Sequence, residues 1–168
     1  MATITYLPIA TSTVSGTTTN TITFSSIPNT YTDLVLVQSL PGDPTATYGY
    51  SNIRLNSDTG TNYSSTYEYY YNALTPGRQA NVTSILHGTS SYMGNANIIT
   101  HIQNYSSTVN NKTTISRVNL GANANGVMQE IFLSAGLYRS TSAITSVTAF
   151  IGSGNYSSGS TFTLYGIL

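Results

Sequence analysis

Residues 143–168 read Ala143-Ile-Thr-Ser-Val-Thr-Ala-Phe-Ile151, then Gly152-Ser-Gly-Asn-Tyr-Ser-Ser-Gly159, then Ser160-Thr-Phe-Thr-Leu-Tyr-Gly-Ile-Leu168. In the last run, Phe162, Leu164, Gly166 and Leu168 alternate with Thr163, Tyr165 and Ile167, which is the period of a β-strand. The Gly, Ser and Asn residues of the middle run favour tight turns. The pattern therefore predicts two strands, over 143–151 and 161–168, that pair as a hairpin.

The rest of the chain repeats this pattern of short strands and turns. Strands are predicted over 21–27, 33–40, 48–56, 67–71, 81–86, 97–105, 112–120 and 130–137. Asp33–Leu40 is almost continuously apolar, as in a central strand covered on both faces; Pro76-Gly77 is expected to close a strand, and Gly136 to form a bulge. No apolar period of 3.6 residues persists. The sequence predicts an all-β, two-sheet, jelly-roll-like β-sandwich.

A chain of 168 residues is long enough for one domain with a sizeable core. Residues 1–20 begin with a short apolar run and continue as a Thr/Ser-rich segment. We expect an extended N-terminal arm over 1–20, with an edge strand as one option, and a single β-sandwich domain over 21–168.

The surface chemistry is unusual because only 6% of the residues are charged, against about a quarter in an average domain. The net charge is zero, which argues against nucleic acid as a partner. There are no cysteines, no signal-peptide pattern and no apolar run of membrane-spanning length. We expect a protein made in a cytoplasm, without membrane or nucleic-acid partners, whose neutral surface favours ordered self-association.

Catalytic and metal-binding patterns are weak. Glu68 and Glu130 are the only glutamates that an acid–base pair could use, and no Gly-x-Ser-x-Gly motif is present. His87 and His101 stand in no metal-ligand spacing, and His101 is expected to be an ordinary strand residue. Asp58-Thr-Gly-Thr-Asn62 lacks the alternating carboxylates of a calcium loop and is predicted to be an Asx turn. We expect no enzyme activity, no cofactor and no metal.

Tyrosine is the most informative local feature, with 14 in the chain and a concentration between residues 48 and 71. On a strand, Tyr67, Tyr69 and Tyr71 share one face. Tyrosine combines apolar area with a polar tip, which suits a subunit interface, and the same rings can stack on sugars or pack a core. These three uses remain open at the level of the sequence.

Four runs of the chain resemble one family. They are Ile22-Thr-Phe-Ser-Ser-Ile-Pro-Asn-Thr-Tyr-Thr-Asp-Leu-Val-Leu-Val37, Ile53-Arg-Leu-Asn-Ser-Asp-Thr-Gly-Thr-Asn-Tyr63, Tyr138-Arg-Ser-Thr-Ser-Ala-Ile-Thr-Ser-Val147 and Gly159-Ser-Thr-Phe-Thr-Leu-Tyr-Gly-Ile167. Together they resemble virion structural proteins of tailed bacteriophages. The match covers both ends and part of the middle, and it consists of strand and turn signatures.

The resemblance implies a virion location and a structural role. The leading hypothesis is a capsid decoration (cement) protein, a homo-oligomer with a trimer favoured, that contacts the major capsid protein or other virion proteins. The alternative is a tail-fibre, receptor-binding or carbohydrate-binding module with a host glycan as partner. The interface residues expected are Ile4, Tyr6 and Leu7 of the arm and Tyr67, Tyr69 and Tyr71 of the tyrosine strand.

Overall fold

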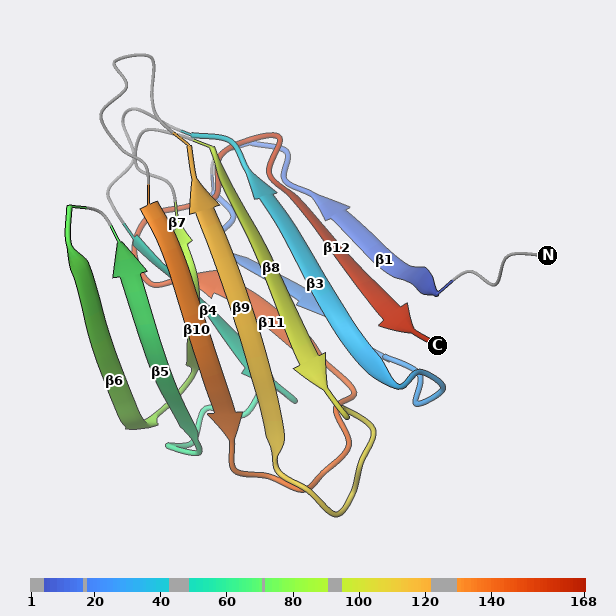
Figure 1. The fold of residues 1–168 in the computed structure, drawn as a ribbon. Helices are drawn as coiled ribbons and strands as arrows, with labels where there is room; N and C mark the ends of the chain where they lie inside the picture. Colours follow the sequence, from blue (N-terminus) through green and yellow to red (C-terminus); the bar gives the residue numbers. More distant parts are fainter. Residues whose placement is uncertain (1–4, 17, 43–48, 71, 91–94, 122–129) are drawn as a thin grey trace.

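The computed structural model describes residues 5–16, 18–42, 49–70, 72–90, 95–121 and 130–168. They form two antiparallel sheets packed face to face, so the predicted all-β sandwich is confirmed (Figure 1). No described residue belongs to a helix, so this part of the chain has no helix long and apolar enough to cross a membrane. The jelly-roll assignment stays a prediction.

The larger sheet has eight strands in the order β1 (Tyr6–Thr13), β12 (Thr161–Ile167), β3 (Asp33–Leu40), β8 (Ala96–Gln103), β9 (Lys112–Leu120), β10 (Glu130–Tyr138), β5 (Tyr63–Tyr70) and β6 (Leu74–Val82). The smaller sheet has four strands in the order β2 (Thr21–Phe24), β11 (Val147–Ile151), β4 (Gly49–Leu55) and β7 (Ile85–Ser90). The smaller sheet lies behind the larger one in Figure 1, where one face of the larger sheet is turned toward the viewer and is covered by no other sheet.

Alternation decides which side chains enter the core between the sheets. Along β9 every second residue from Lys112 to Leu120 is buried and every residue between is exposed, and β10 repeats the pattern. In β12 the buried set is Phe162, Leu164 and Gly166, which the alternation of the sequence places on one side of the strand. These strands thus turn one face toward the core and leave the other on the outside.

The predicted C-terminal hairpin is wrong. β11 pairs with β2 and β4 in the smaller sheet, whereas β12 pairs with β1 and β3 in the larger one. The turn-rich residues 152–159 therefore cross from one sheet to the other. Face-packed sheets lie only about 10 Å apart, so a connection of this length bridges them easily. A local pattern of alternation and turn residues does not distinguish this crossing from a hairpin.

Three further local predictions are also corrected. Pro76 and Gly77 lie inside β6, an edge strand, where a missing backbone N–H is tolerated. The segment 81–86 spans the end of β6 and the start of β7. Gly136 forms no bulge, because the pairing of β10 runs on in register on both sides of it. A Cβ at Gly136 would lie 2.4 Å from Thr114 Oγ1 of β9 and 2.5 Å from Ile85 Cγ2 of β7, so close packing by the neighbouring strand and by the facing sheet requires this glycine.

β3 is central in the larger sheet, as predicted, but another sheet covers only one of its faces. Leu34 and Leu36 are fully buried in the core. Val35 points to the outside, between its register neighbours Tyr165 and His101, and is 5% exposed. Both faces of β3 are therefore apolar because one is buried in the core and the other is covered by large side chains of the adjacent strands.

Candidate interaction surface

Two of the three N-terminal residues named from the sequence, Tyr6 and Leu7, lie at the edge of the larger sheet. β1 is hydrogen-bonded along β12, and Tyr6 is 55% exposed, with its ring edge-on to Tyr165 at 6.3 Å between centroids. Leu7 is half-buried. Ile4 lies outside the described residues. The described part of segment 1–20 is thus attached to its own domain, with Val14 buried in the core.

Tyr67 and Tyr69 share a face of β5, as the alternation predicts, and that face points inward. Their rings stack on Phe132 of β10, at centroid distances of 5.5 Å and 6.4 Å. Both are partly buried and packed against the core. Tyr71 lies outside the described residues. For Tyr67 and Tyr69 the structure therefore favours packing over a free interface.

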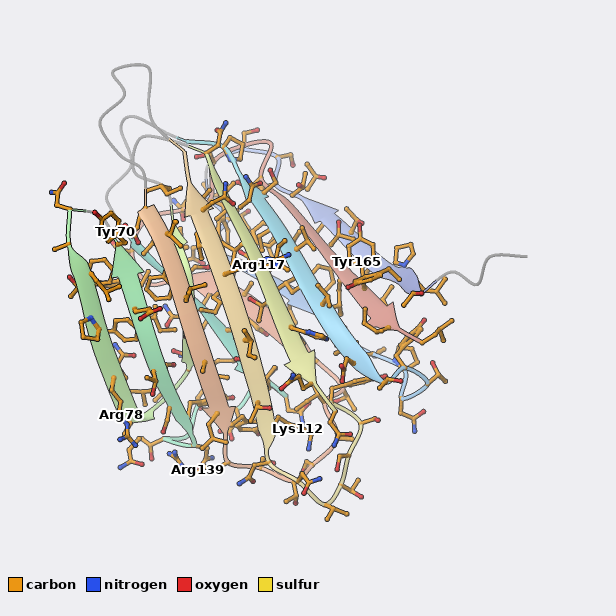
Figure 2. All side chains as sticks on the ribbon, in the orientation of Figure 1. Tyr70, Arg78, Lys112, Arg117, Arg139 and Tyr165 are labelled. Atoms are coloured by element: carbon orange, nitrogen blue, oxygen red, sulfur yellow. The ribbon has the colours of Figure 1, made fainter. Side chains whose placement is uncertain are left out.

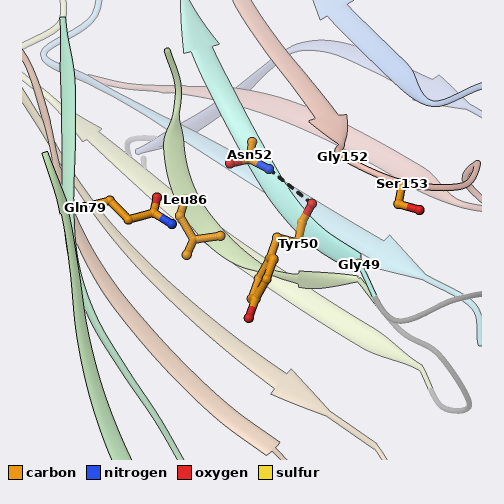
Figure 3. Close-up of a pocket in the computed structure, with 7 residues that line it drawn as sticks. All are labelled: Gly49, Tyr50, Asn52, Gln79, Leu86, Gly152 and Ser153. Atoms are coloured by element: carbon orange, nitrogen blue, oxygen red, sulfur yellow. Dashed lines mark hydrogen bonds between the residues drawn. The ribbon is translucent and has the colours of Figure 1, made fainter. Parts of the chain in front are cut away.

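The tyrosine that opens to solvent beside this stack is Tyr50 of β4, which is 46% exposed. Burial raises the pKa of the Tyr50 hydroxyl, and the nearby Tyr67, Tyr69 and Glu130 raise it further. Tyr50 lines a pocket of about 330 Å³ together with Gly49, Asn52, Gln79, Leu86, Gly152 and Ser153 (Figure 3).

The polar groups of this pocket come from two strands of different sheets. Asn52 is held by two contacts, because its side-chain nitrogen donates to the Tyr50 carbonyl at 3.2 Å and its Oδ1 accepts from Ser84 Oγ at 3.2 Å. The Gln79 amide reaches the pocket from edge strand β6, where Figure 3 shows it beside Leu86. A half-exposed ring beside two amides, one of them held in place, is an arrangement that can hold a small polar ligand.

The outer face of the larger sheet is the most apolar exposed surface among the described residues. Ile131 and Leu133 of β10 and Ile115 of β9 point outward and are 59%, 43% and 56% exposed. Leu133, Ala135 and Ile115 line a shallow groove of about 380 Å³ with Pro76 of β6, and its walls are mostly apolar. Contiguous exposed apolar side chains of this kind mark interaction sites more often than isolated ones do.

Few charged groups interrupt this face. Arg117 projects from β9 near its centre and Arg78 from β6 at its edge (Figure 2). Glu68 is exposed on β5. His101 of β8 is paired with Asp33 of β3, its Nε2 lying 3.2 Å from Asp33 Oδ2. The face is therefore apolar with a small number of well-separated charges.

The two glutamates considered for acid–base chemistry lie on opposite faces of the larger sheet. Glu68 is exposed on the outer face, whereas Glu130 is 3% exposed on the inner face, where Thr89 Oγ1 donates to its Oε1 at 3.1 Å. One substrate bond cannot lie between them, so the arrangement does not support the pair.

A serine and a histidine meet in the core, and no sequence pattern distinguishes this serine from the many others in the chain. Ser51 Oγ lies 2.9 Å from His87 Nε2, and His87 Nδ1 lies 2.8 Å from Thr100 Oγ1. Thr100 in turn contacts Ser116 at 3.0 Å. Ser51 and His87 are fully buried and the third group is a hydroxyl, so the set lacks both substrate access and the carboxylate of a catalytic triad.

Asp58 confirms the predicted Asx turn. Its Oδ1 accepts from the Gly60 N–H at 2.7 Å, and its Oδ2 accepts from the Asn62 amide at 2.8 Å. These two hydrogen bonds lower the pKa of Asp58, and Asn62 contributes most. Across the part of the chain that the structure describes, no group of three His, Cys, Asp or Glu residues is placed to hold a metal ion.

No family model, no curated protein and no solved structure matches this chain.

Proposed function

We propose that this chain is a structural subunit of a phage particle, and specifically a capsid decoration protein that works through surface contact. The observation that carries the proposal is the apolar outer face of the larger sheet, centred on Ile115, Ile131 and Leu133. The low charge of the chain supports the same role, because burying such a surface leaves few charged groups to desolvate.

The physical effect of a decoration protein follows from linkage. A protein that binds the assembled shell and not its separate subunits stabilises the assembled state by mass action. Burial of apolar surface contributes about 25 cal/mol per Å², so a face of exposed Ile and Leu side chains is an effective source of binding energy. The edge strand β1, with the exposed Tyr6, offers a second contact surface at the margin of the sheet.

The copy number of this chain in purified particles tests the proposal, measured by quantitative mass spectrometry against the major capsid protein. Hundreds of copies in a fixed ratio to the shell lattice are expected. A few to a few dozen copies would move the protein to the tail, and absence from particles would overturn the proposal.

Re-addition of purified variants to undecorated particles tests the surface itself. The pair Ile131→Ser and Leu133→Ser is expected to lower occupancy at least about tenfold. Val109→Ser is the matched control, because Val109 is an exposed apolar side chain that lies off the sheet, between β8 and β9. Equal occupancy of the two variants would show that the outer face is not used.

A second candidate function is favoured by the Tyr50 pocket, which suits a glycan on a tail appendage. Sugars are held by an aromatic ring against their apolar face and by amides that bond their hydroxyls. Tyr50→Ala is expected to abolish glycan binding in a host-polysaccharide array. Tyr70→Ala, which removes a ring of similar exposure from the outer face, is expected to retain glycan binding. No binding by the unchanged protein would end this candidate.

A further inference from the structure

The pairing of β5, β10 and β9 places two opposite charges in one row across the outer face. Leu133 of β10 is paired with Glu68 on one side and with Arg117 on the other. Across the sheet, the acidic Glu68, the apolar Leu133 and the basic Arg117 thus follow one another on adjacent strands. Adjacent strands lie about 4.8 Å apart. Neither charged side chain has an ion pair or hydrogen bond with any other described residue.

From this row we propose that the partner of the outer face is a second copy of the same chain, related by a two-fold axis that runs along β10. The proposal rests on the proposed function: the outer face joins two copies into the unit that decorates the shell, and the β1 edge with the exposed Tyr6 is left to contact the shell. Rotation about this axis places the β5 side of one copy opposite the β9 side of the other. Residues paired in register across the strands stay at the same height along β10. Glu68 of each copy then faces Arg117 of the other.

The apolar residues of β10 lie on the axis and pack on their own counterparts. Ile131 meets Ile131, and Leu133 meets Leu133, at the centre of the contact. Pro76, two strands from β10 on one side, faces Ile99, which lies two strands away on the other side. The centre is thus apolar and the two charge pairs flank it, which is the usual anatomy of a specific interface.

The remaining charges of the face obey the same symmetry. Arg78 of β6 and His101 of β8 lie at one level, each two strands from β10. Across the axis Arg78 therefore faces His101 of the second copy, which is already paired with the Asp33 carboxylate. The Asp33 carboxylate beside His101 offers this guanidinium a charge of opposite sign.

Other two-fold arrangements of this face are unfavourable. An axis along β5 would set Glu68 against Glu68, and one along β9 would set Arg117 against Arg117. An axis perpendicular to the strands through Leu133 would set Glu68 against Glu68 and also Arg117 against Arg117. Only the axis along β10 makes the charge pattern self-complementary, and like charges forced together cost several kcal/mol.

The size of the face also fits a second copy. Five strands at about 4.8 Å and about nine residues at about 3.3 Å cover a plane of roughly 700 Å². A stable interface buries about 800 Å² on each partner, so the two values are close.

Charge reversal in separate and mixed samples tests the proposal by analytical ultracentrifugation. The unchanged protein is expected to dimerise, and Glu68→Arg and Arg117→Glu are each expected to weaken dimerisation at least about tenfold. A mixture of the two variants is expected to form a heterodimer, because each opposed pair is then of opposite charge again. The double variant is expected to recover the homodimer. Circular dichroism at each step excludes unfolding as the cause.

The outcomes separate this proposal from the function on which it rests. A monomer at concentrations up to about 100 μM, or loss of dimer without rescue in the mixture, overturns the two-fold contact. If such a monomer still occupies particles in a fixed ratio to the shell, the decoration role stands and a shell protein covers the face. A rescued dimer that is absent from particles supports the two-fold contact and overturns the decoration role.

Discussion

Ser51 Oγ and His87 Nε2 lie 2.9 Å apart in the fully buried centre of the sandwich. The Gln38 amide nitrogen lies 3.3 Å from the same ring nitrogen and can only donate, so Nε2 accepts and Nδ1 carries the proton toward Thr100. The contact connects β4 of the smaller sheet with β7, and Thr100 extends it to β8 of the larger sheet. The network therefore ties the two sheets together through a neutral imidazole.

The buried imidazole predicts acid sensitivity. Burial lowers the pKa of His87 to about 3, whereas an unfolded histidine titrates near 6.5. Between these values the unfolded chain binds a proton that the folded chain does not, so stability falls as the pH drops from about 6.5 to about 3. The expected loss from this group is on the order of 4 kcal/mol.

Urea unfolding at pH 7, 6, 5 and 4 measures this effect against His87→Gln, which lacks the titrating ring. All other ionisable groups are the same in both proteins, so their contributions cancel in the difference. The variant is expected to be less stable at pH 7 and to lose less stability on acidification. Parallel pH profiles would show that His87 is not held neutral.

Gly166 is expected to tolerate no side chain. A Cβ at this position of β12 would lie 2.3 Å from Cγ of the Tyr31 ring, which covers the glycine. Gly166→Ala should lower the free energy of unfolding by about 1–3 kcal/mol, as overpacking does elsewhere. Gly152→Ala is the control, because open space surrounds Gly152, and it should change stability by less than about 0.5 kcal/mol. Equal effects would contradict the contact.

The Tyr63 hydroxyl is expected to stabilise the turn after β4. It accepts from the Leu55 N–H at 3.2 Å and lies 3.1 Å from the carbonyl oxygens of both Leu55 and Asp58. Burial raises the pKa of this hydroxyl, so it stays protonated as a donor. Tyr63→Phe should cost about 1–3 kcal/mol in thermal or urea unfolding. Tyr70→Phe, at an exposed ring, should be neutral, and a neutral Tyr63→Phe would rule out the role.

Lys112 is expected to hold two loops together from a buried position. Its Nζ donates to the carbonyls of Ser107 at 2.7 Å, Asn110 at 2.8 Å and Thr141 at 3.2 Å. Lys112→Met removes all three bonds and should cost about 2–4 kcal/mol. Hydrogen exchange should quicken in the loops 104–111 and 139–146. Arg78→Met is the control, because it also removes one cation but breaks no hydrogen bond among the described residues. In this variant the same two loops should exchange as in the unchanged protein.

Some features followed from the sequence alone because they depend on neighbours along the chain. A side chain two residues away on a strand lies on the same face, so the alternation of the sequence places Phe162 and Leu164 together on one face of β12. The Asx turn at Asp58 followed in the same way, because its hydrogen bonds join residues two to four positions apart. The all-β class is the sum of such local signals.

The tertiary structure decided what depends on residues far apart in sequence. Alternation along a strand does not determine which strands lie beside it. β12 pairs with β1, which is at the other end of the sequence, and the expected hairpin with β11 does not form. Pairing also turned Tyr67 onto Phe132 and brought Ser51 to His87 in the core. It set Glu68 and Arg117, 49 positions apart, on either side of Leu133. Local pattern fixes which face of a strand is apolar, and only long-range packing determines what covers that face.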